Sequence, residues 1–352
     1  MVWLLRGATA AWPRPAMTQI RDVAARAGVS VASVSRVLAG RPGVGEDIRR
    51  RVLDAVKALD YRPDLAARRL RSRRTDTIGL IVADIRNPFF TEISRAVEDV
   101  AYHQRMRVIL CNTDEDPVRE QSCLELMQDE NVSGVILAPS LRLLSRFRST
   151  DYPFPLVLVD RCNPETSADA VVLDNVEAAR ALTAHMLDNA HRRVLFLHGA
   201  SSATGRQRLQ GYAQAMADRG LAPEAVGVAP VADRSREVAQ ALLARPSLPE
   251  AVLASSGLIL LGLVQALRDA GRRVPTDIAI GGFDDMPWTR LVDPGVTVIA
   301  QPTYDIGRSA AELLLRRIAD PATPVRRVVH RGDLVVRGSS APAARDRSAA
   351  TR

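Results

Sequence analysis

The sequence predicts an α/β protein in which a small N-terminal helical unit precedes a two-lobed body built on parallel sheets. Three observations predict this architecture. Apolar residues recur at helical spacing between residues 20 and 59, short apolar runs alternate with helical stretches from Ile78 onward, and basic residues concentrate near the N-terminus. With 352 residues and 47% apolar content, the chain is long enough to bury the cores of two or three domains.

Two short helices joined by a glycine-containing turn are predicted within residues 20–38, IRDVAARAGVSVASVSRVL. The first places one apolar face at Ile20, Val23, Ala24 and Ala27. Gly28 interrupts this helix, and Ser30 is suited to cap the second. The second helix buries Val34, Val37 and Leu38 and leaves Val31, Ala32, Ser35 and Arg36 on or near its other face. This arrangement is typical of the helix-turn-helix, whose second helix enters the major groove of DNA, although a small hairpin that binds nothing is the alternative.

Positive charge is concentrated in this helical head and favours DNA binding. Residues 17–74 contain thirteen Arg and one Lys against six Asp or Glu, a net charge of +8. The termini, 1–16 and 341–352, add +4, so residues 75–340 sum to −4. A basic head on a slightly acidic body is the electrostatic pattern of a DNA-binding domain attached to another domain.

A third helix and a basic linker complete the head. The helix is predicted over residues 46–59, with an inward face of Ile48, Val52, Ala55, Val56 and Leu59, which gives a three-helix domain over residues 17–63. Residues 64–75 form the linker, in which Asp64 is an N-cap and LAARRL favours a helix. Such a segment is too short to stay helical alone, because isolated helices below roughly 12–15 residues are marginal in water.

The two ends of the chain are expected to lie outside the folded domains. Residues 1–16 contain an apolar run that Arg6 cuts too short for a secretory signal, so we expect a disordered or spurious extension before Met17. Residues 341–352 are expected to be a disordered tail. Since no apolar run approaches the roughly 18 residues that a membrane span needs, the sequence predicts no membrane partner. The odd number of cysteines fits reduced thiols in a cytoplasmic protein.

The sequence gives little support for a catalytic or metal-binding site. Cys111, Cys123 and Cys162 lack paired metal-ligand spacing and are predicted to be reduced, buried thiols. The five histidines are scattered, and there is no G-x-S-x-G, no P-loop and no G-x-G-x-x-G after a strand. We therefore expect no metal, no cofactor and no enzymatic activity.

Residues 76–340 are predicted to form two α/β lobes. Many of the short β-branched runs are separated by helical stretches, such as those predicted to begin at Phe90 and Glu120. The runs are IGLIVAD, RVILCNT, GVILAPS, LVLVDR, AVVLDN, RVLFLHG, AVLASS and IAIGGFDD. Buried strands that alternate with helices indicate parallel sheets covered on both faces, and this many units exceed one sheet. Ligands of such folds bind outside the carboxyl ends of the strands.

Polar and aromatic residues follow several of these strands and are predicted to line a ligand cleft. They are Asn87, Phe89, Phe90, Asp160, Arg161, Arg208, Asp284 and Gln301. Aromatic rings stack on the apolar faces of a sugar, and charged groups make directional bonds to its hydroxyls. Taken singly, each residue has an ordinary alternative, such as a turn residue at Asp284, a surface charge at Arg208 or a core position at Phe89.

Together, the head and the cleft residues resemble the lactose/galactose-repressor family of bacterial transcriptional regulators. DVAARAGVS-VASVSRVL and IRRRVLDAVKALDYRPDLAARRL are similar to the family's head, and the match continues to about Ser340. The pattern NPFF…DR…R…FD…Q is closest to ribose-binding members, with Ser256 at a site position where those members have Asn. The resemblance implies a periplasmic-binding-protein-like core and a small effector, such as a pentose or related sugar.

The same resemblance implies the DNA contacts and the mechanism. The recognition helix contacts DNA through Val31, Ala32, Ser33, Ser35 and Arg36. The linker is implied to become a hinge helix only on DNA, with Leu70 wedged into the minor groove. A sugar-controlled repressor is therefore implied, which binds palindromic operator DNA as a homodimer, since the tail lacks the leucine heptads of a tetramer. A binding protein of a transport system is the alternative, and the basic head argues against it.

Overall fold

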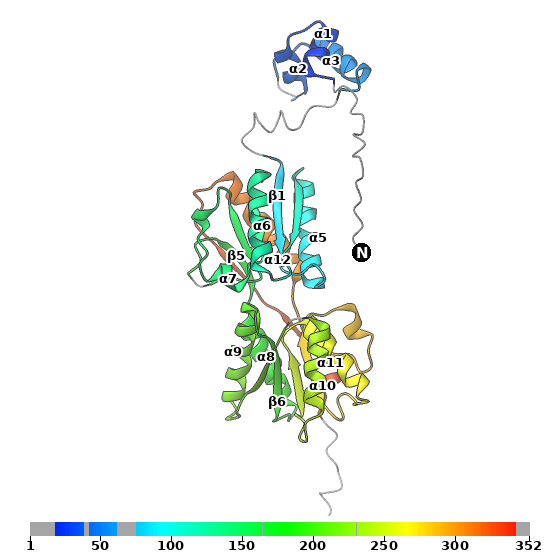
Figure 1. Cartoon of the computed structure of the whole chain (residues 1–352), viewed down its shortest axis with the longest axis vertical. Helices are drawn as coiled ribbons and strands as arrows, with labels where there is room; N and C mark the ends of the chain where they lie inside the picture. The colour runs from blue at the N-terminus through cyan, green and yellow to red at the C-terminus, as the bar shows by residue number, and fades with distance from the viewer. Residues whose placement is uncertain (1–17, 39–41, 62–74, 164, 230, 343–352) are drawn as a thin grey trace, which may run out of the picture. The chain divides into compact units, whose positions relative to one another are not determined.

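The chain contains two compact units, which we describe separately from a computed structural model. The units are Met1–Arg73 and Arg74–Arg352, and the structure describes residues 18–38, 42–61, 75–163, 165–229 and 231–342 (Figure 1). The predictions for residues 1–16, for linker residues 64–74 including Leu70, and for the tail beyond Pro342 lie outside the described residues.

The described part of the first unit contains α1 (Ile20–Ala27), α2 (Val31–Leu38) and α3 (Glu46–Ala58), which confirms the three predicted helices. Their inward side chains form one core, as the helical spacing predicted: Val23, Ala24, Ala27, Val34, Val37, Val52 and Ala55. Tyr61, which follows α3, also packs into this core. Gly45 precedes α3 and provides no side-chain cap.

The second unit contains two six-stranded sheets, one in each lobe, which confirms the predicted two-lobed body. The first lobe has the strand order β11 (Arg327–His330), β5 (Asp169–Leu173), β4 (Leu156–Val159), β3 (Val135–Leu137), β1 (Thr77–Val82) and β2 (Arg107–Asn112). The second lobe has the order β12 (Asp333–Val335), β10 (Thr297–Ala300), β9 (Ala279–Phe283), β8 (Ala251–Ala254), β6 (Val194–Gly199) and β7 (Glu224–Val228). All paired strands are parallel except β10 and β12.

Helices cover both faces of each sheet (Figure 1). The first lobe carries α5 (Pro88–His103), α6 (Pro117–Asp129), α7 (Leu141–Leu144), η1 (Ser149–Asp151) and α12 (Thr303–Ala319). The second lobe carries α8 (Asn175–Asp188), α9 (Ala203–Ala217), α10 (Ala232–Leu243), α11 (Gly257–Asp269), η2 (Pro287–Arg290) and η3 (Gly338–Ser340). In the described ranges, no helix combines the length and the apolar character needed to cross a membrane.

Two of the predicted helix starts were wrong by two or three residues, because polar caps extend the helices towards their N-termini. α5 begins at Pro88 rather than Phe90, and the side chain of Asn87 accepts the N–H of Phe89 at 3.1 Å. α6 begins at Pro117 rather than Glu120, with Asp116 in the equivalent capping position. Proline suits the first helical position, where its missing N–H costs no hydrogen bond.

The chain crosses between the lobes three times within its described residues. The crossings connect β5 to α8, β10 to α12 and β11 to β12. Gly332 lies in the third crossing, and a Cβ atom there would lie 2.6 Å from Cγ2 of Ile299 and 3.6 Å from Cδ1 of Leu173. The third crossing therefore packs against the ends of β10 and β5, the strands from which the other two crossings leave.

The three cysteines are free thiols, but burial is complete for only one of them. Cys162 is buried, whereas Cys111 and Cys123 are half-buried. Burial raises the pKa of all three thiols, to about 12 for Cys123. They therefore remain protonated and weakly nucleophilic at neutral pH.

Candidate functional site

The helix α2 presents the predicted DNA-contacting residues away from the core of the head. Val31 is 39% exposed, Ala32 and Arg36 are exposed, and Ser33 and Ser35 are intermediate. The hydroxyl of Ser30 accepts the N–H of Ser33 at 3.1 Å, which confirms the predicted cap. The exposed side of α2 thus combines two small apolar side chains with one guanidinium.

The turn between α1 and α2 depends on Gly28 and on Arg51 from α3. Gly28 has φ of 63°, in the left-handed region that favours glycine. Arg51 donates from Nη2 to the carbonyl oxygens of Ala27 at 2.5 Å and of Gly28 at 3.1 Å. A Cβ atom at position 28 would lie 2.7 Å from this Nη2, so a side chain there would displace Arg51.

We expect Gly28→Ala to destabilise the head by about 2–4 kcal/mol, since it adds left-handed strain and removes bonds from a charged donor. A domain this small has little stability to lose, so retention on DNA should fall strongly. The matched control is Gly271→Ala, because Gly271 has φ of 62° with nothing within 4 Å of its added Cβ. Equal DNA retention by the two variants would contradict this role of the turn.

A cavity of about 260 Å³ lies at the carboxyl ends of the strands of the second unit. All nine residues predicted for the ligand cleft line it. The first lobe contributes Asn87, Phe89, Phe90, Asp160 and Arg161, and the second lobe contributes Arg208, Ser256, Asp284 and Gln301. The structure therefore brings together residues that lie more than 200 positions apart in the sequence.

Ten further residues line the cavity and were not identified from the sequence: Asp84, Arg86, Asp114, Glu115, Ser201, Ser202, Thr204, Ala229, Val231 and Leu258. Several of them follow β1, β2 and β6, as the predicted residues follow their own strands. The rule that ligands bind at the carboxyl ends of strands would have found these polar turns if it had been applied to every strand.

Three helix N-termini point their caps at the cavity. Asn87 caps α5, Ser202 caps α9 and Ser256 caps α11, each with a side-chain oxygen that accepts a backbone N–H. Beside Asn87, the rings of Phe89 and Phe90 meet edge to face with centroids 5.0 Å apart. Both rings also belong to the core of the first lobe, so their core position and their place in the cavity wall are compatible.

Arg208 is held in place by neutral acceptors and is only 4% exposed, so it is not the surface charge considered as an alternative. It donates from Nε to Asn175 at 2.7 Å, from Nη1 to the carbonyl of Ser255 at 2.5 Å and from Nη2 to Gln301 at 3.3 Å. Its guanidinium carbon lies 3.9 Å from the ring centroid of Phe283. Two of its five N–H groups remain for a ligand.

Two carboxylates occupy corresponding positions in the two lobes. Asp160 follows β4 with φ of 70°, and Asp284 follows β9 with φ of 75°. Asp284 accepts the N–H of Gly257 at 2.8 Å at the start of α11 and also accepts from the amide of Gln301. Left-handed backbone at non-glycine residues costs free energy and concentrates at functional sites.

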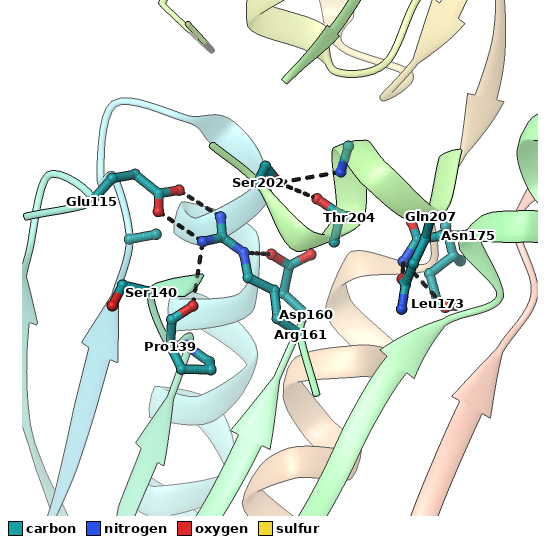
Figure 2. A network of polar contacts seen from close by, with 12 residues as sticks. Glu115, Pro139, Ser140, Asp160, Arg161, Leu173, Asn175, Ser202, Thr204 and Gln207 are labelled. Atoms are coloured by element: carbon teal, nitrogen blue, oxygen red, sulfur yellow. Dashed lines mark hydrogen bonds and ion pairs between the residues drawn. The ribbon is translucent and has the colours of Figure 1, made fainter. Parts of the chain in front are cut away.

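Arg161 is already bonded to protein groups on most of its donors (Figure 2). It donates from Nη1 and Nη2 to the two carboxylate oxygens of Glu115 at 2.7 and 2.5 Å, from Nε to Asp160 at 2.9 Å, and from Nη1 to the carbonyl of Pro139 at 3.3 Å. Burial lowers the pKa of Arg161, but Glu115 and Asp160 outweigh this and raise the pKa above its usual range. Arg161 therefore lines the cavity, as the sequence predicted, but only one of its five N–H groups remains for a ligand.

Comparison with known proteins agrees with both units. Residues 19–64 match the family described as bacterial regulatory proteins, lacI family, and residues 183–340 match the periplasmic binding protein-like domain. The ribose operon repressor of Halalkalibacterium halodurans is 35% identical over 303 residues, which cover 86% of this chain and 91% of that protein.

Solved structures give the same result for the fold. The lac repressor dimer bound to operator and the anti-inducer ONPF has a TM-score of 0.84 at 22% identity and covers 93% of this chain and 100% of its own. A LacI family transcriptional regulator from Enterococcus faecium with bound ribose has a TM-score of 0.67 at 27% identity and covers 76% of this chain and 99% of its own.

These findings do not favour the alternative of a transport-system binding protein, because the match includes the DNA-binding head. The chain therefore belongs to the lacI family of bacterial regulatory proteins, and it is a DNA-binding transcriptional regulator rather than an enzyme.

Proposed function

We propose that this protein is a cytoplasmic repressor that binds palindromic operator DNA as a homodimer and responds to a small sugar in the cavity of the second unit. The observation that carries the proposal is the convergence of nine predicted residues from two lobes on one cavity. The repression itself is supported by the similarity to a ribose operon repressor over most of both chains.

The domains divide this work between them. Residues 17–63 bind DNA, residues 64–75 form the hinge helix with Leu70 as its wedge, and residues 76–340 bind effector and dimerise. The DNA surface is made by Val31, Ala32, Ser33, Ser35 and Arg36.

The effector is a pentose or a related sugar. Asn87, Phe89, Phe90, Asp160, Arg161, Arg208, Ser256, Asp284 and Gln301 form its site, and a similar regulator was solved with ribose bound. Aromatic rings together with fixed polar groups suit a polyhydroxylated molecule. Serine at position 256 is shorter than the asparagine of ribose-binding members, so the preferred sugar can be larger at that point.

Control of DNA binding follows from the position of this cavity. A ligand that contacts both lobes stabilises their closure around it. Closure changes the position of the first lobe, which directly follows the linker in the chain. A short hinge helix is marginal by itself, so a small displacement can melt it. The effector needs only to bind one arrangement better than the other, with a coupling free energy of typically about 1–3 kcal/mol.

Readout of the operator is tested at Arg36. Val31 and Ala32 offer only apolar contacts, such as those to thymine methyl groups, so Arg36 should provide the hydrogen-bonding readout of bases. We expect Arg36→Ala to lose about 1–3 kcal/mol of discrimination between operator and random DNA in fluorescence anisotropy titrations.

The control is Arg36→Lys, which keeps the charge but not the planar fork. Lysine should retain affinity for random DNA and lose part of the preference for operator. If Arg36→Ala weakens operator and random DNA equally, Arg36 contacts phosphate and the assignment is overturned.

A further inference from the structure

We infer that Glu115 is a specificity determinant of the cavity and that, by pairing with Arg161, it makes the site accept uncharged polyhydroxylated ligands and reject sugar acids. The inference rests on the proposed sugar-binding function and specifies the charge of the ligand. Glu115 comes from the turn after β2, which the sequence did not single out.

The pairing of Glu115 with Arg161 occupies the face of the guanidinium that a ligand carboxylate would need. Both carboxylate oxygens of Glu115 accept from the two terminal nitrogens, at 2.7 and 2.5 Å (Figure 2). Planar two-point pairing of this type is how arginine binds carboxylates. Because Asp160 and the carbonyl of Pro139 hold two more donors, an incoming carboxylate finds a single N–H on a side chain that is 5% exposed.

The backbone holds Glu115 in this position. Asp114 and Glu115 have φ of 51° and 59°, so two consecutive non-glycine residues adopt the left-handed conformation. The N–H of Glu115 donates to the carbonyl of Ala83 at 3.1 Å, and the next residue, Asp116, caps α6. Left-handed backbone of this kind persists only where the surrounding structure enforces it, so the turn fixes the backbone from which the Glu115 side chain reaches Arg161.

The other charges of the cavity also disfavour an anionic ligand. Its lining contains five carboxylates, from Asp84, Asp114, Glu115, Asp160 and Asp284, against three guanidiniums, from Arg86, Arg161 and Arg208. Arg86 pairs with Asp84 through two bonds of 2.9 and 3.0 Å. Arg208 has neutral bonding partners, but the charges of Asp284 and Asp160 already act on it and oppose the lowering of its pKa by burial.

An anion would therefore enter a cavity in which carboxylates outnumber guanidiniums, Arg86 and Arg161 are paired with carboxylates, and Arg208 lies under the influence of Asp284 and Asp160. Hydroxyl groups meet no such penalty, because each can donate to a carboxylate and accept from an amide or a guanidinium. The Glu115–Arg161 pair is thus a repulsive element against sugar acids as much as it is part of the wall.

The test compares neutral sugars with their own carboxylates. Purified full-length protein is screened by thermal shift, followed by calorimetric titration, with D-ribose, D-xylose, D-glucose and D-galactose, their alditols and their aldonates. Wild type should be stabilised by at least one neutral compound and by none of the aldonates. Glu115→Gln removes the charge but keeps the shape, and we expect it to bind at least one aldonate about ten- to one-hundredfold more tightly than wild type does.

Asp116→Asn is the matched control, because it makes the same chemical change one residue away. Asp116 does not line the cavity, and asparagine is as good a cap for α6 as aspartate. Its ligand preferences should therefore equal those of wild type, which separates a local effect of Glu115 from a general loss of negative charge.

Three results would overturn the inference. One is stabilisation of wild type by an aldonate at the concentration at which its parent sugar acts, a measurement that needs no variant to fold. The second is a folded Glu115→Gln protein that gains no aldonate binding while it still binds the neutral sugar. The third, a panel in which no neutral compound binds wild type, overturns the proposed sugar effector together with this inference, so the two failures are distinguishable.

Discussion

Replacement of Arg208 by lysine should weaken effector binding by about 100-fold or more and leave operator binding intact, which gives a repressor that no longer responds. Arg208 lines the cavity, has three fixed acceptors and stacks on Phe283, which leaves two of its N–H groups for a ligand. Lysine has the same net charge, but it carries that charge on a single ammonium group, which cannot reach all three acceptors at once. Each hydrogen bond to a charged group that is lost is worth about 1.5–3 kcal/mol.

Arg206→Lys provides the control, since Arg206 lies on the same helix but is exposed and does not line the cavity. Calorimetric titration with the sugar that stabilises wild type should show unchanged affinity for this variant. The assignment of Arg208 fails if the two lysine variants bind that sugar equally well.

The second large effect is expected at Gly211, where α9 packs on α8. A Cβ atom at this position would lie 2.0 Å from the carbonyl oxygen and 2.9 Å from the carbonyl carbon of Val176. These are backbone atoms, so the helices must separate. We expect Gly211→Ala to cost about 2–3 kcal/mol. By the usual conversion, the Tm of the second unit should fall by about 4–12 °C in a calorimetric scan.

The matched control for this packing effect is Gly220→Asn. Gly220 lies just beyond the end of α9, has φ of 65°, and has nothing within 4 Å of an added Cβ. Asparagine tolerates this backbone conformation, so the Tm should change little. If the Gly211→Ala protein has the same Tm as the control, α8 and α9 tolerate separation and the prediction fails.

The wall of the cavity could be predicted from the sequence because parallel strands end at one edge of a sheet. Asn87 and Asp160 follow strands of the first sheet and Asp284 follows a strand of the second, so the topology of each sheet gathers its own turns at the edge that lines the cavity. The exposed side of α2 was predictable for a similar reason, since helical periodicity fixes which side chains are buried.

The pairing within that wall could not be predicted. Glu115 and Arg161 are 46 positions apart, and their contact depends on two left-handed residues in a turn that carries no glycine. The same limit applies to Arg208, whose acceptors Asn175 and Gln301 are 33 and 93 positions away in the sequence. Periodicity reports which face of an element is buried, but it does not report which polar partners satisfy a buried charge.

These contacts of Arg208 also connect the cavity to the crossings between the lobes. Asn175 is the first residue of α8, directly after the first crossing, and Gln301 lies in the second crossing. A ligand that engages the two remaining N–H groups of Arg208 therefore acts on a side chain that is bonded to both crossings. This provides a physical route from occupancy of the cavity to the relative position of the lobes.

The most direct test of a sugar-controlled repressor is a reciprocal titration. The sugar is titrated calorimetrically into the full-length protein with and without operator, and operator is titrated with and without sugar, in wild type and in Arg208→Lys. Coupling is reciprocal, so in wild type the two ligands should change each other's affinity by one common factor, typically about 5- to 150-fold, and the factor should be lost in the variant. Equal sugar affinities in the presence and absence of operator would contradict the account, even if the protein binds both ligands.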